Sequence, residues 1–358
     1  MAQDPSATPA ATPAPATPSA TTKAAATRRA RLFSGLRILL ALLVVAAVAV
    51  AVAKNWREVS ADIGRIDAAT FVLAAVLVCL PPVFTVLGWR VLMADLGSPL
   101  HLAPAGGIFF VGQLGKYVPG AVWSIVAQAE IGARLHIPRK RSAVVAFVSV
   151  AMAAICGLIV GAPALPLLIT RDDSAARTGW ALLLAVPLLA VVLWPPLLNW
   201  GIATVLRVLR REQLEHRLSG RAVLAATLYF IAAWVSSGLH VLVLARAIGA
   251  DTGTGQLVLA SLSGFALASS IAMFSVILPA GVGVREGVLV LILAPVTSTS
   301  AATAVVVISR FLTVAADVVF ALGGWLYARS HHLVTSPQER QHDHIEVDPD
   351  VPADGSRS

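Results

Sequence analysis

The sequence predicts an all-α protein built as a bundle of membrane-spanning helices. Of its 358 residues, 57% are hydrophobic and 13% are charged, a balance too apolar for a soluble domain of this length. Apolar runs of 17 to 28 residues recur along the chain, and about 20 such residues are enough to cross a bilayer. Residues 257–328 form a stretch of 72 with only four charges. We therefore expect a polytopic membrane protein.

Six apolar runs are predicted as full spans, at residues 37–53, 68–92, 142–169, 180–206, 222–245 and 301–328. Two further apolar segments, 103–132 and 256–295, are each interrupted by proline and glycine. A half-helix of about 15 residues, rising 1.5 Å per residue, does not cross a 30 Å hydrocarbon core. Re-entrant or short-helix hairpins are therefore expected at both segments.

The chain divides into three parts by composition. Residues 1–35 are a Pro/Ala/Thr-rich tail with a basic end, 36–328 carry the transmembrane domain, and 329–358 are polar. Both tails lack the apolar side chains needed to order themselves, so we expect them to be disordered. The histidines of the second tail are interpreted as solvated residues and not as a metal site, and no cofactor is predicted.

Lysine and arginine collect in the loops 134–141 and 207–221, which predicts that both loops face the cytoplasm. Segments 54–67 and 171–177 balance their charges and suit the outer face of the plasma membrane. Following the spans between these loops places both termini in the cytoplasm. The net charge of +8 is attributed to contact with anionic lipid headgroups and not with nucleic acid.

The same topology makes the second half of the domain inverted relative to the first. Residues 88–92, Gly-Trp-Arg-Val-Leu, resemble residues 238–242, Gly-Leu-His-Val-Leu. Residues 117–122, Tyr-Val-Pro-Gly-Ala-Val, resemble residues 277–282, Ile-Leu-Pro-Ala-Gly-Val. Interrupted apolar segments at corresponding places in two halves are typical of transporter substrate sites. We therefore predict an inverted repeat.

The candidate binding site follows from charges at membrane depth. Such a charge costs on the order of 3 kcal/mol unless it meets a partner or water. A glycine-rich break followed by a helix start offers backbone N–H groups to an anion, and an arginine there can grip a phosphate with its planar fork. The candidate substrate-binding residues are Arg285, Glu286, Arg310, Asp317, Lys116, Tyr117, Gln113, Gly281 and Gly283.

Each candidate also has a structural interpretation. The four charges of the second half could pair between helices and fix packing without binding anything. Lys116 and Tyr117 could anchor at the membrane interface. Glu286 could bind an amine or only neutralise Arg285, although neighbouring residues point about 100 degrees apart on a helix, so different partners are expected. His240 is interpreted as a packed, hydrogen-bonded histidine.

Three segments resemble one known family. They are Gly112-Gln-Leu-Gly-Lys-Tyr-Val-Pro-Gly-Ala-Val-Trp123, Leu278-Pro-Ala-Gly-Val-Gly-Val-Arg-Glu-Gly287 and Ser309-Arg-Phe-Leu312. Together they are similar to the membrane region of lysylphosphatidylglycerol synthases and their stand-alone relatives. The resemblance implies a lipid flippase-like fold. In bifunctional members this region moves an aminoacylated phospholipid, which a separate soluble domain makes. That soluble domain is expected to be absent here.

The favoured function is translocation of an anionic or aminoacylated phospholipid, or a lipid-linked headgroup, between leaflets. The alternatives are a membrane enzyme acting on lipid or polyprenyl phosphate, and a non-transporting accessory subunit. No catalytic residue is predicted, and without a Walker A motif ATP is not expected to drive transport directly. The expected partners are membrane lipid and either a second copy of the chain or a separate lipid-modifying enzyme.

Overall fold

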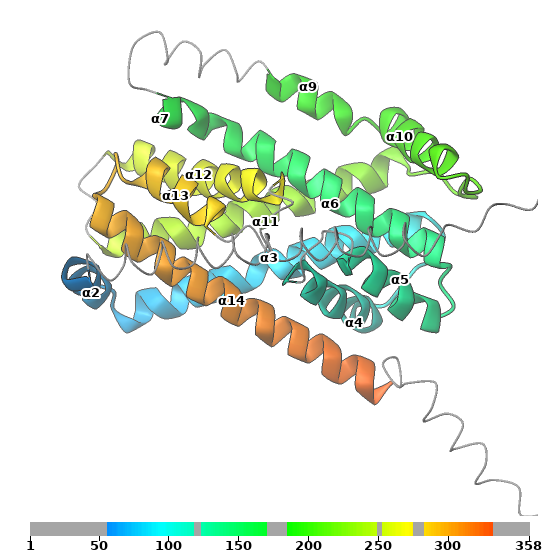
Figure 1. The fold of residues 1–358 in the computed structure, drawn as a ribbon, viewed down its shortest axis with the longest axis horizontal. Helices are drawn as coiled ribbons and strands as arrows, with labels where there is room; N and C mark the ends of the chain where they lie inside the picture. The colour runs from blue at the N-terminus through cyan, green and yellow to red at the C-terminus, as the bar shows by residue number, and fades with distance from the viewer. Residues whose placement is uncertain (1–55, 118–122, 170–184, 249–252, 275–282, 332–358) are drawn as a thin grey trace, which may run out of the picture.

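The structure is a computed structural model that describes residues 56–117, 123–169, 185–248, 253–274 and 283–331. Every regular element in these ranges is a helix. The four longest helices lie along the long axis of the molecule (Figure 1): α3 (Ala68–Asp95), α6 (Arg139–Gly161), α11 (Gly220–Ala247) and α14 (Thr299–Ser330). The predicted all-α helical bundle is confirmed.

Five of the described helices are long and apolar enough to cross a membrane. Four of them match the predicted spans 68–92, 142–169, 222–245 and 301–328, the second continuing through η2 (Ala162–Ala164) into α7 (Leu165–Ile169). The fifth is α12 (Thr254–Phe274). The predicted span 37–53 lies outside the described residues.

The predicted span 180–206 is not one straight helix. Its described part consists of α9 (Ala185–Val192) and α10 (Pro195–Val208), which are bent by 63°. Trp194 caps α10 in an extended conformation, and prolines follow it at the first helical positions. Proline lacks the N–H that would continue α9 but fits the first turn of a new helix. The bend therefore follows from local sequence.

Pairs of packed helices occupy both predicted hairpin segments, although the first helix of the second pair is longer than the predicted half-helix. The first consists of α4 (Leu102–Gln113), η1 (Leu114–Tyr117) and α5 (Trp123–Arg134), with α4 packed on α5. In the second, α12 packs on the short α13 (Val284–Leu293). Because the helix-breaking proline comes late in this segment, α12 reaches 21 residues and is itself of bilayer length. The second hairpin is thus asymmetric.

The two halves of the bundle repeat the same order of elements. Both α11 and α12 start 152 residues after their counterparts α3 and α4. The N-cap residues also correspond, because Asp67 and Ser219 each accept a hydrogen bond from the backbone N–H three residues later. The hairpins lie toward opposite ends of the long axis (Figure 1). This arrangement supports the predicted inverted repeat.

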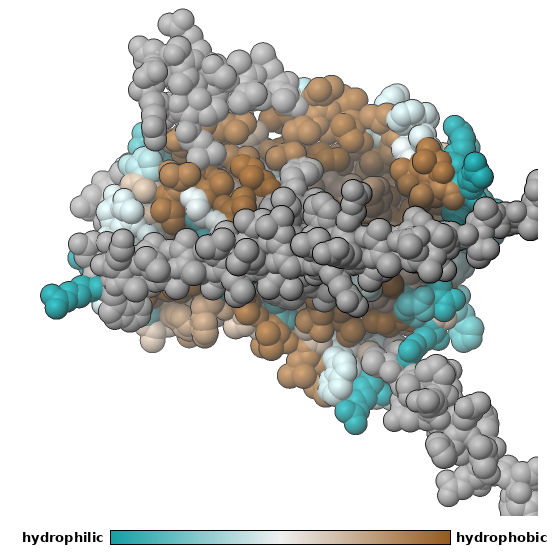
Figure 2. All heavy atoms as spheres, in the orientation of Figure 1, coloured by the Kyte–Doolittle hydropathy of each residue, from teal (hydrophilic) through white to brown (hydrophobic). Residues whose placement is uncertain are grey.

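Close helix packing forms the core. A Cβ atom added to Gly238 on α11 would stand 2.3 Å from the Cα atom of Leu262 on α12, so only glycine permits this backbone approach. Outward-facing apolar side chains remain exposed, including Val72, Phe147 and Phe311 at 53 to 65%. Above and below the grey atoms that cross the visible face, hydrophobic residues predominate, and hydrophilic residues gather toward both ends (Figure 2). Such a surface suits contact with lipid tails.

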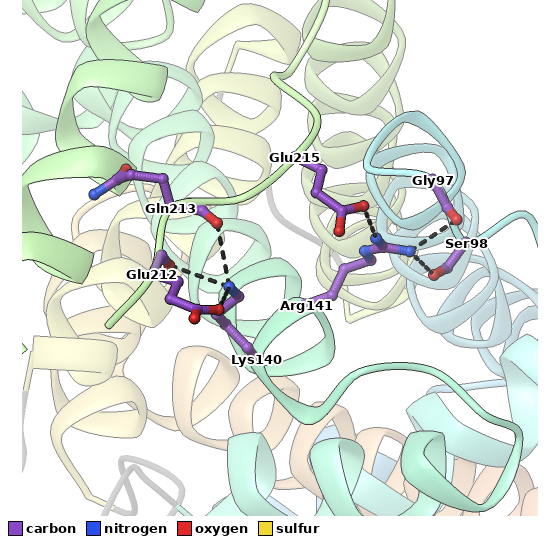
Figure 3. Close-up of polar contacts among 7 residues, drawn as sticks. All are labelled: Gly97, Ser98, Lys140, Arg141, Glu212, Gln213 and Glu215. Carbon is purple, nitrogen blue, oxygen red and sulfur yellow. Dashed lines mark hydrogen bonds and ion pairs between the residues drawn. The ribbon is translucent and has the colours of Figure 1, made fainter. Parts of the chain in front are cut away.

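The two basic loops meet (Figure 3), at the end of the bundle where α5 and α10 end and α6 begins (Figure 1). Arg141 donates to the carbonyl oxygen of Gly97 at 2.8 Å and to Ser98 Oγ at 2.7 Å, and it pairs with Glu215 at 3.6 Å. Lys140 donates to the carbonyl oxygens of residues 212 and 213, each at 3.2 Å. Loops 134–141 and 207–221 therefore share one side, as the topology requires.

At the opposite end lies α2 (Trp56–Gly64), in a segment predicted only as an outer loop. It packs against α14. Arg65, just beyond it, donates to the carbonyl oxygen of Ile248 at the end of α11, at 3.1 Å. Helix ends carry unpaired carbonyls with a partial negative charge, so an arginine stabilises this end.

Arg141→Lys is expected to lower the free energy of unfolding by about 1–2 kcal/mol. A single ammonium cannot bridge the acceptors on the 97–98 turn and Glu215 together as the planar guanidinium does. Thermal unfolding of the purified protein in detergent measures the change. The control is Arg139→Lys, because Arg139 forms an exposed pair with Glu130 and should leave the unfolding temperature unchanged. Equal effects of the two variants would contradict the prediction.

Candidate functional site

The site begins at the first turn of α13. Gly283 caps this helix with φ of +86°, in the left-handed region that favours glycine. Its backbone N–H donates to Glu286 Oε2 at 2.6 Å, and its carbonyl oxygen accepts the N–H of Gly287 at 2.8 Å. Glu286 thus folds back over the helix start, where the helix dipole favours a negative charge.

Two guanidinium groups flank this carboxylate. Glu286 Oε1 lies 3.2 Å from Arg285 Nη2 and 3.4 Å from Arg310 Nη1 on α14. The Glu286 side chain is 11% exposed, that of Arg285 16% and that of Arg310 25%. The expectation that Arg285 and Glu286 have different partners was wrong. Because Glu286 curls toward Gly283, its carboxylate comes alongside the neighbouring arginine.

Helices α11 and α12 complete the surroundings of Arg285. Its guanidinium carbon lies 5.6 Å from the centroid of the Phe265 ring, close enough for a cation–π contact. On α11, His240 packs edge-on against the same ring with centroids 5.2 Å apart. His240 Nε2 and Ser309 Oγ are 2.8 Å apart, and both side chains are buried. His240 is therefore a packed, hydrogen-bonded residue, as interpreted from the sequence.

Asp317 lies on α14 two turns beyond Arg310 and interacts electrostatically with Arg285. The four charged candidates of the second half, Arg285, Glu286, Arg310 and Asp317, therefore form one cluster. We call these residues the charge cluster. It contains two cations and two anions, so its formal charge is zero.

The candidates of the first half are only partly described. Gln113 is half-buried at the end of α4, whereas the side chains of Lys116 and Tyr117 lie outside the described part of the chain. Gly281 also lies outside it. The structure thus brings together Gly283 and the charge cluster, and it leaves the first-hairpin candidates without described side-chain contacts to that cluster.

The packing of α4 on α14 nevertheless shows where the first hairpin points. A Cβ atom on Gly107 would meet the Tyr327 ring, and the rings of Phe110 and Phe320 have centroids 4.9 Å apart. These pairs make α4 and α14 antiparallel. Since helical residues rise 1.5 Å each, the end of α4 lies at the level of Asp317. The described end of α4 is therefore directed toward the charge cluster.

Sequence reasoning missed Phe265 as part of the site. This residue lies in an apolar helix among other apolar residues, so no pattern distinguishes it. Gln128, which is 3% exposed, packs its side chain over Gly112 within the first hairpin. Unlike Phe265, Gln128 stands out in the sequence, as a polar residue in a short interrupted apolar segment.

The long apolar helices, two interrupted hairpins and an internal charge cluster define a polytopic helical membrane protein with a polar site. Residues 38–322 match the family described as the lysylphosphatidylglycerol synthase TM region. This match covers most of the chain, which therefore belongs to that family. The resemblance seen in the three sequence segments is confirmed, and the chain is a membrane protein related to lipid handling. No curated sequence matched it in a direct comparison.

Gly283→Ala is expected to destabilise the protein by about 1–2 kcal/mol, because a Cβ atom is strained at φ of +86°. The measurement is thermal unfolding in detergent. Gly287→Ala is the matched control on the same helix, since a Cβ atom there meets no atom within 4 Å. Alanine in a helix interior gains up to about 1 kcal/mol over glycine. A destabilisation at Gly287 as large as that at Gly283 would contradict the strain argument.

Proposed function

We propose that this protein is a flippase that moves an anionic phospholipid, or a lipid-linked headgroup with a phosphate, between the membrane leaflets. The observation that carries the proposal is the convergence of Arg285 and Arg310 on one carboxylate within an apolar bundle. Charges at such depth are expensive and typically mark a pathway for a polar substrate. Membership of a lipid-related membrane family supports the same conclusion.

The chemistry of the cluster suits a phosphate. Guanidinium groups form paired, charge-assisted hydrogen bonds with phosphate oxygens. The first turn of α13 adds a backbone N–H group at a helix start, which is a favourable position for an anion. Arg310, 25% exposed, is the member through which a headgroup could first make contact.

Interhelical packing is the strongest competing explanation for these charges. A packing role accounts for one ion pair between α13 and α14. It does not account for the second guanidinium at the same carboxylate. The partial exposure of the Arg285 and Arg310 side chains, 16% and 25%, and the proline- and glycine-rich sequence before Gly283 favour an opening for cargo. The end of α4, directed to the same level, supports a site shared by both halves.

The enzyme alternative receives less support. His240 and Ser309 form the serine–histidine contact nearest to the arginines, and a nucleophile with a base beside a phosphate site would suit a hydrolase. However, both side chains are at most 1% exposed, so this pair is closed to a substrate in this conformation. It serves as a link between α11 and α14.

The proposal includes an orientation in the plasma membrane. The end that carries loops 134–141 and 207–221 faces the cytoplasm, together with both termini, because lysine and arginine are retained on that side. The end that carries α2 faces outward. A headgroup phosphate would then travel along the bundle axis between these ends, past the charge cluster.

Arg285→Lys is expected to reduce lipid transport about tenfold or more, because a point charge cannot reproduce two-pronged contact with phosphate. The measurement is flipping of fluorescent phosphatidylglycerol in proteoliposomes, with an impermeant quencher reporting the outer leaflet. Arg139→Lys is the control, since Arg139 forms an exposed pair with Glu130 away from the cluster. Wild-type transport by a folded Arg285→Ala variant would refute the proposal and favour an accessory or packing role.

Cysteine labelling on intact cells tests the orientation. In a background with Cys79 and Cys156 replaced by alanine, a cysteine at the exposed Arg211 should resist an impermeant maleimide. A cysteine at the exposed Thr299, at the opposite end of the bundle, should react. Both positions should react after the cells are permeabilised. The reverse pattern would overturn the orientation.

A further inference from the structure

We propose that the Glu286 carboxylate is an internal competitor, which fills the anion position of the charge cluster until a cargo phosphate displaces it. This inference rests on the proposed function and adds how the site is kept filled and how it releases cargo. In this role Glu286 competes with the headgroup phosphate and does not bind a headgroup amine.

The geometry places Glu286 where a phosphate would bind. One of its oxygens accepts the Gly283 backbone N–H at 2.6 Å, and the other faces Arg285 at 3.2 Å and Arg310 at 3.4 Å. A helix-start N–H group with two guanidiniums is the donor set that proteins use for phosphates. The carboxylate therefore occupies these donors as a smaller anion tethered to the chain.

The contacts to the arginines are loose. Charge-assisted hydrogen bonds between N–H and carboxylate normally measure about 2.7–2.9 Å. At the surface, Arg139 and Glu130 reach this quality, with two bonds of 2.8 and 3.0 Å. Within the described residues, Glu286 Oε1 accepts no well-oriented hydrogen bond despite being buried. Glu286 Oε1 therefore lies between two guanidiniums without a well-aligned hydrogen bond to either, and a larger anion with more oxygens could accept such bonds from both.

A tethered competitor also explains release. A site with two arginines and no carboxylate would hold a lipid phosphate tightly, and tight binding slows transport. Because Glu286 is attached next to the site, its carboxylate returns whenever the cargo loosens. Asp317 on α14 and the buried His240 on α11 are the other titratable groups near Arg285, and α12 contributes the apolar ring of Phe265. Glu286 also accepts the Gly283 N–H at the helix start, which places its carboxylate in the anion position.

The test compares binding and transport in Glu286→Gln. Glutamine keeps the shape and an oxygen for the Gly283 N–H but removes the competing charge. Full-length protein in maltoside detergent is titrated with phosphatidylglycerol, and affinity is taken from the rise in unfolding temperature. We expect affinity to increase about tenfold, within the usual range for coupled sites, and flipping in proteoliposomes to slow. Glu130→Gln, which removes the same charge from an exposed arginine pair, should change neither.

Unchanged or weaker binding by Glu286→Gln would overturn the inference. Should that variant not fold, Glu286→Asp serves instead, since the shorter side chain keeps the charge but withdraws it from the arginines and should also tighten binding. Tightening for inorganic phosphate without tightening for phosphatidylglycerol would overturn the lipid assignment.

Arg285→Met and Arg310→Met separate the two proposals. If both arginine variants lose phosphatidylglycerol binding but Glu286→Gln does not bind the lipid more tightly, the competitor role is refuted. The flippase proposal then still stands. Wild-type binding in both arginine variants removes the anion site and with it both proposals.

Discussion

The rest of this structure depends on one constraint, that polar groups in an apolar medium must be satisfied from within the protein. The clearest cases are helix ends. Glu286 accepts a backbone N–H at the start of α13. Arg65 donates to a backbone carbonyl oxygen at the end of α11, and Arg141 donates to one in the turn after α3. Arg65 and Arg141 each reach a backbone group of another element, whereas Glu286 binds the first turn of its own helix. In these three cases a charged side chain satisfies the backbone where a helix begins or ends.

Hydropathy predicted the long helices because each apolar run matches the thickness of a bilayer, and the basic loops predicted which ends lie together. Hydropathy alone missed the bend between α9 and α10, since residues 180–206 are apolar on both sides of Trp194, whereas the two prolines after Trp194 mark it. The length of α12 was likewise missed. A proline marks where a helix must break, but it does not set how long the helix before it is. Hydropathy thus fixes the presence of helices better than their shape.

The charged members of the site could be predicted because each is costly in its apolar setting. Their pairing could not, because side-chain directions on a regular helix say nothing of a first turn in which Glu286 curls back to Gly283. Phe265 carries no sequence signal at all, although its ring supports Arg285. Burial cost identifies which residues need partners, whereas the identity of those partners depends on how α12, α13 and α14 come together.

The charge balance of the cluster has a mechanical consequence. Two arginines and two acids cancel formally, so the bundle can hold the site without a ligand and without burying net charge. In the proposed exchange, a phosphate takes the place of the Glu286 carboxylate beside Arg285 and Arg310. Because the displaced carboxylate stays attached to α13, the cost of binding includes the new partner or water that it must meet. A broken helix suits such an exchange, because its first turn can release one carboxylate without unwinding a continuous span.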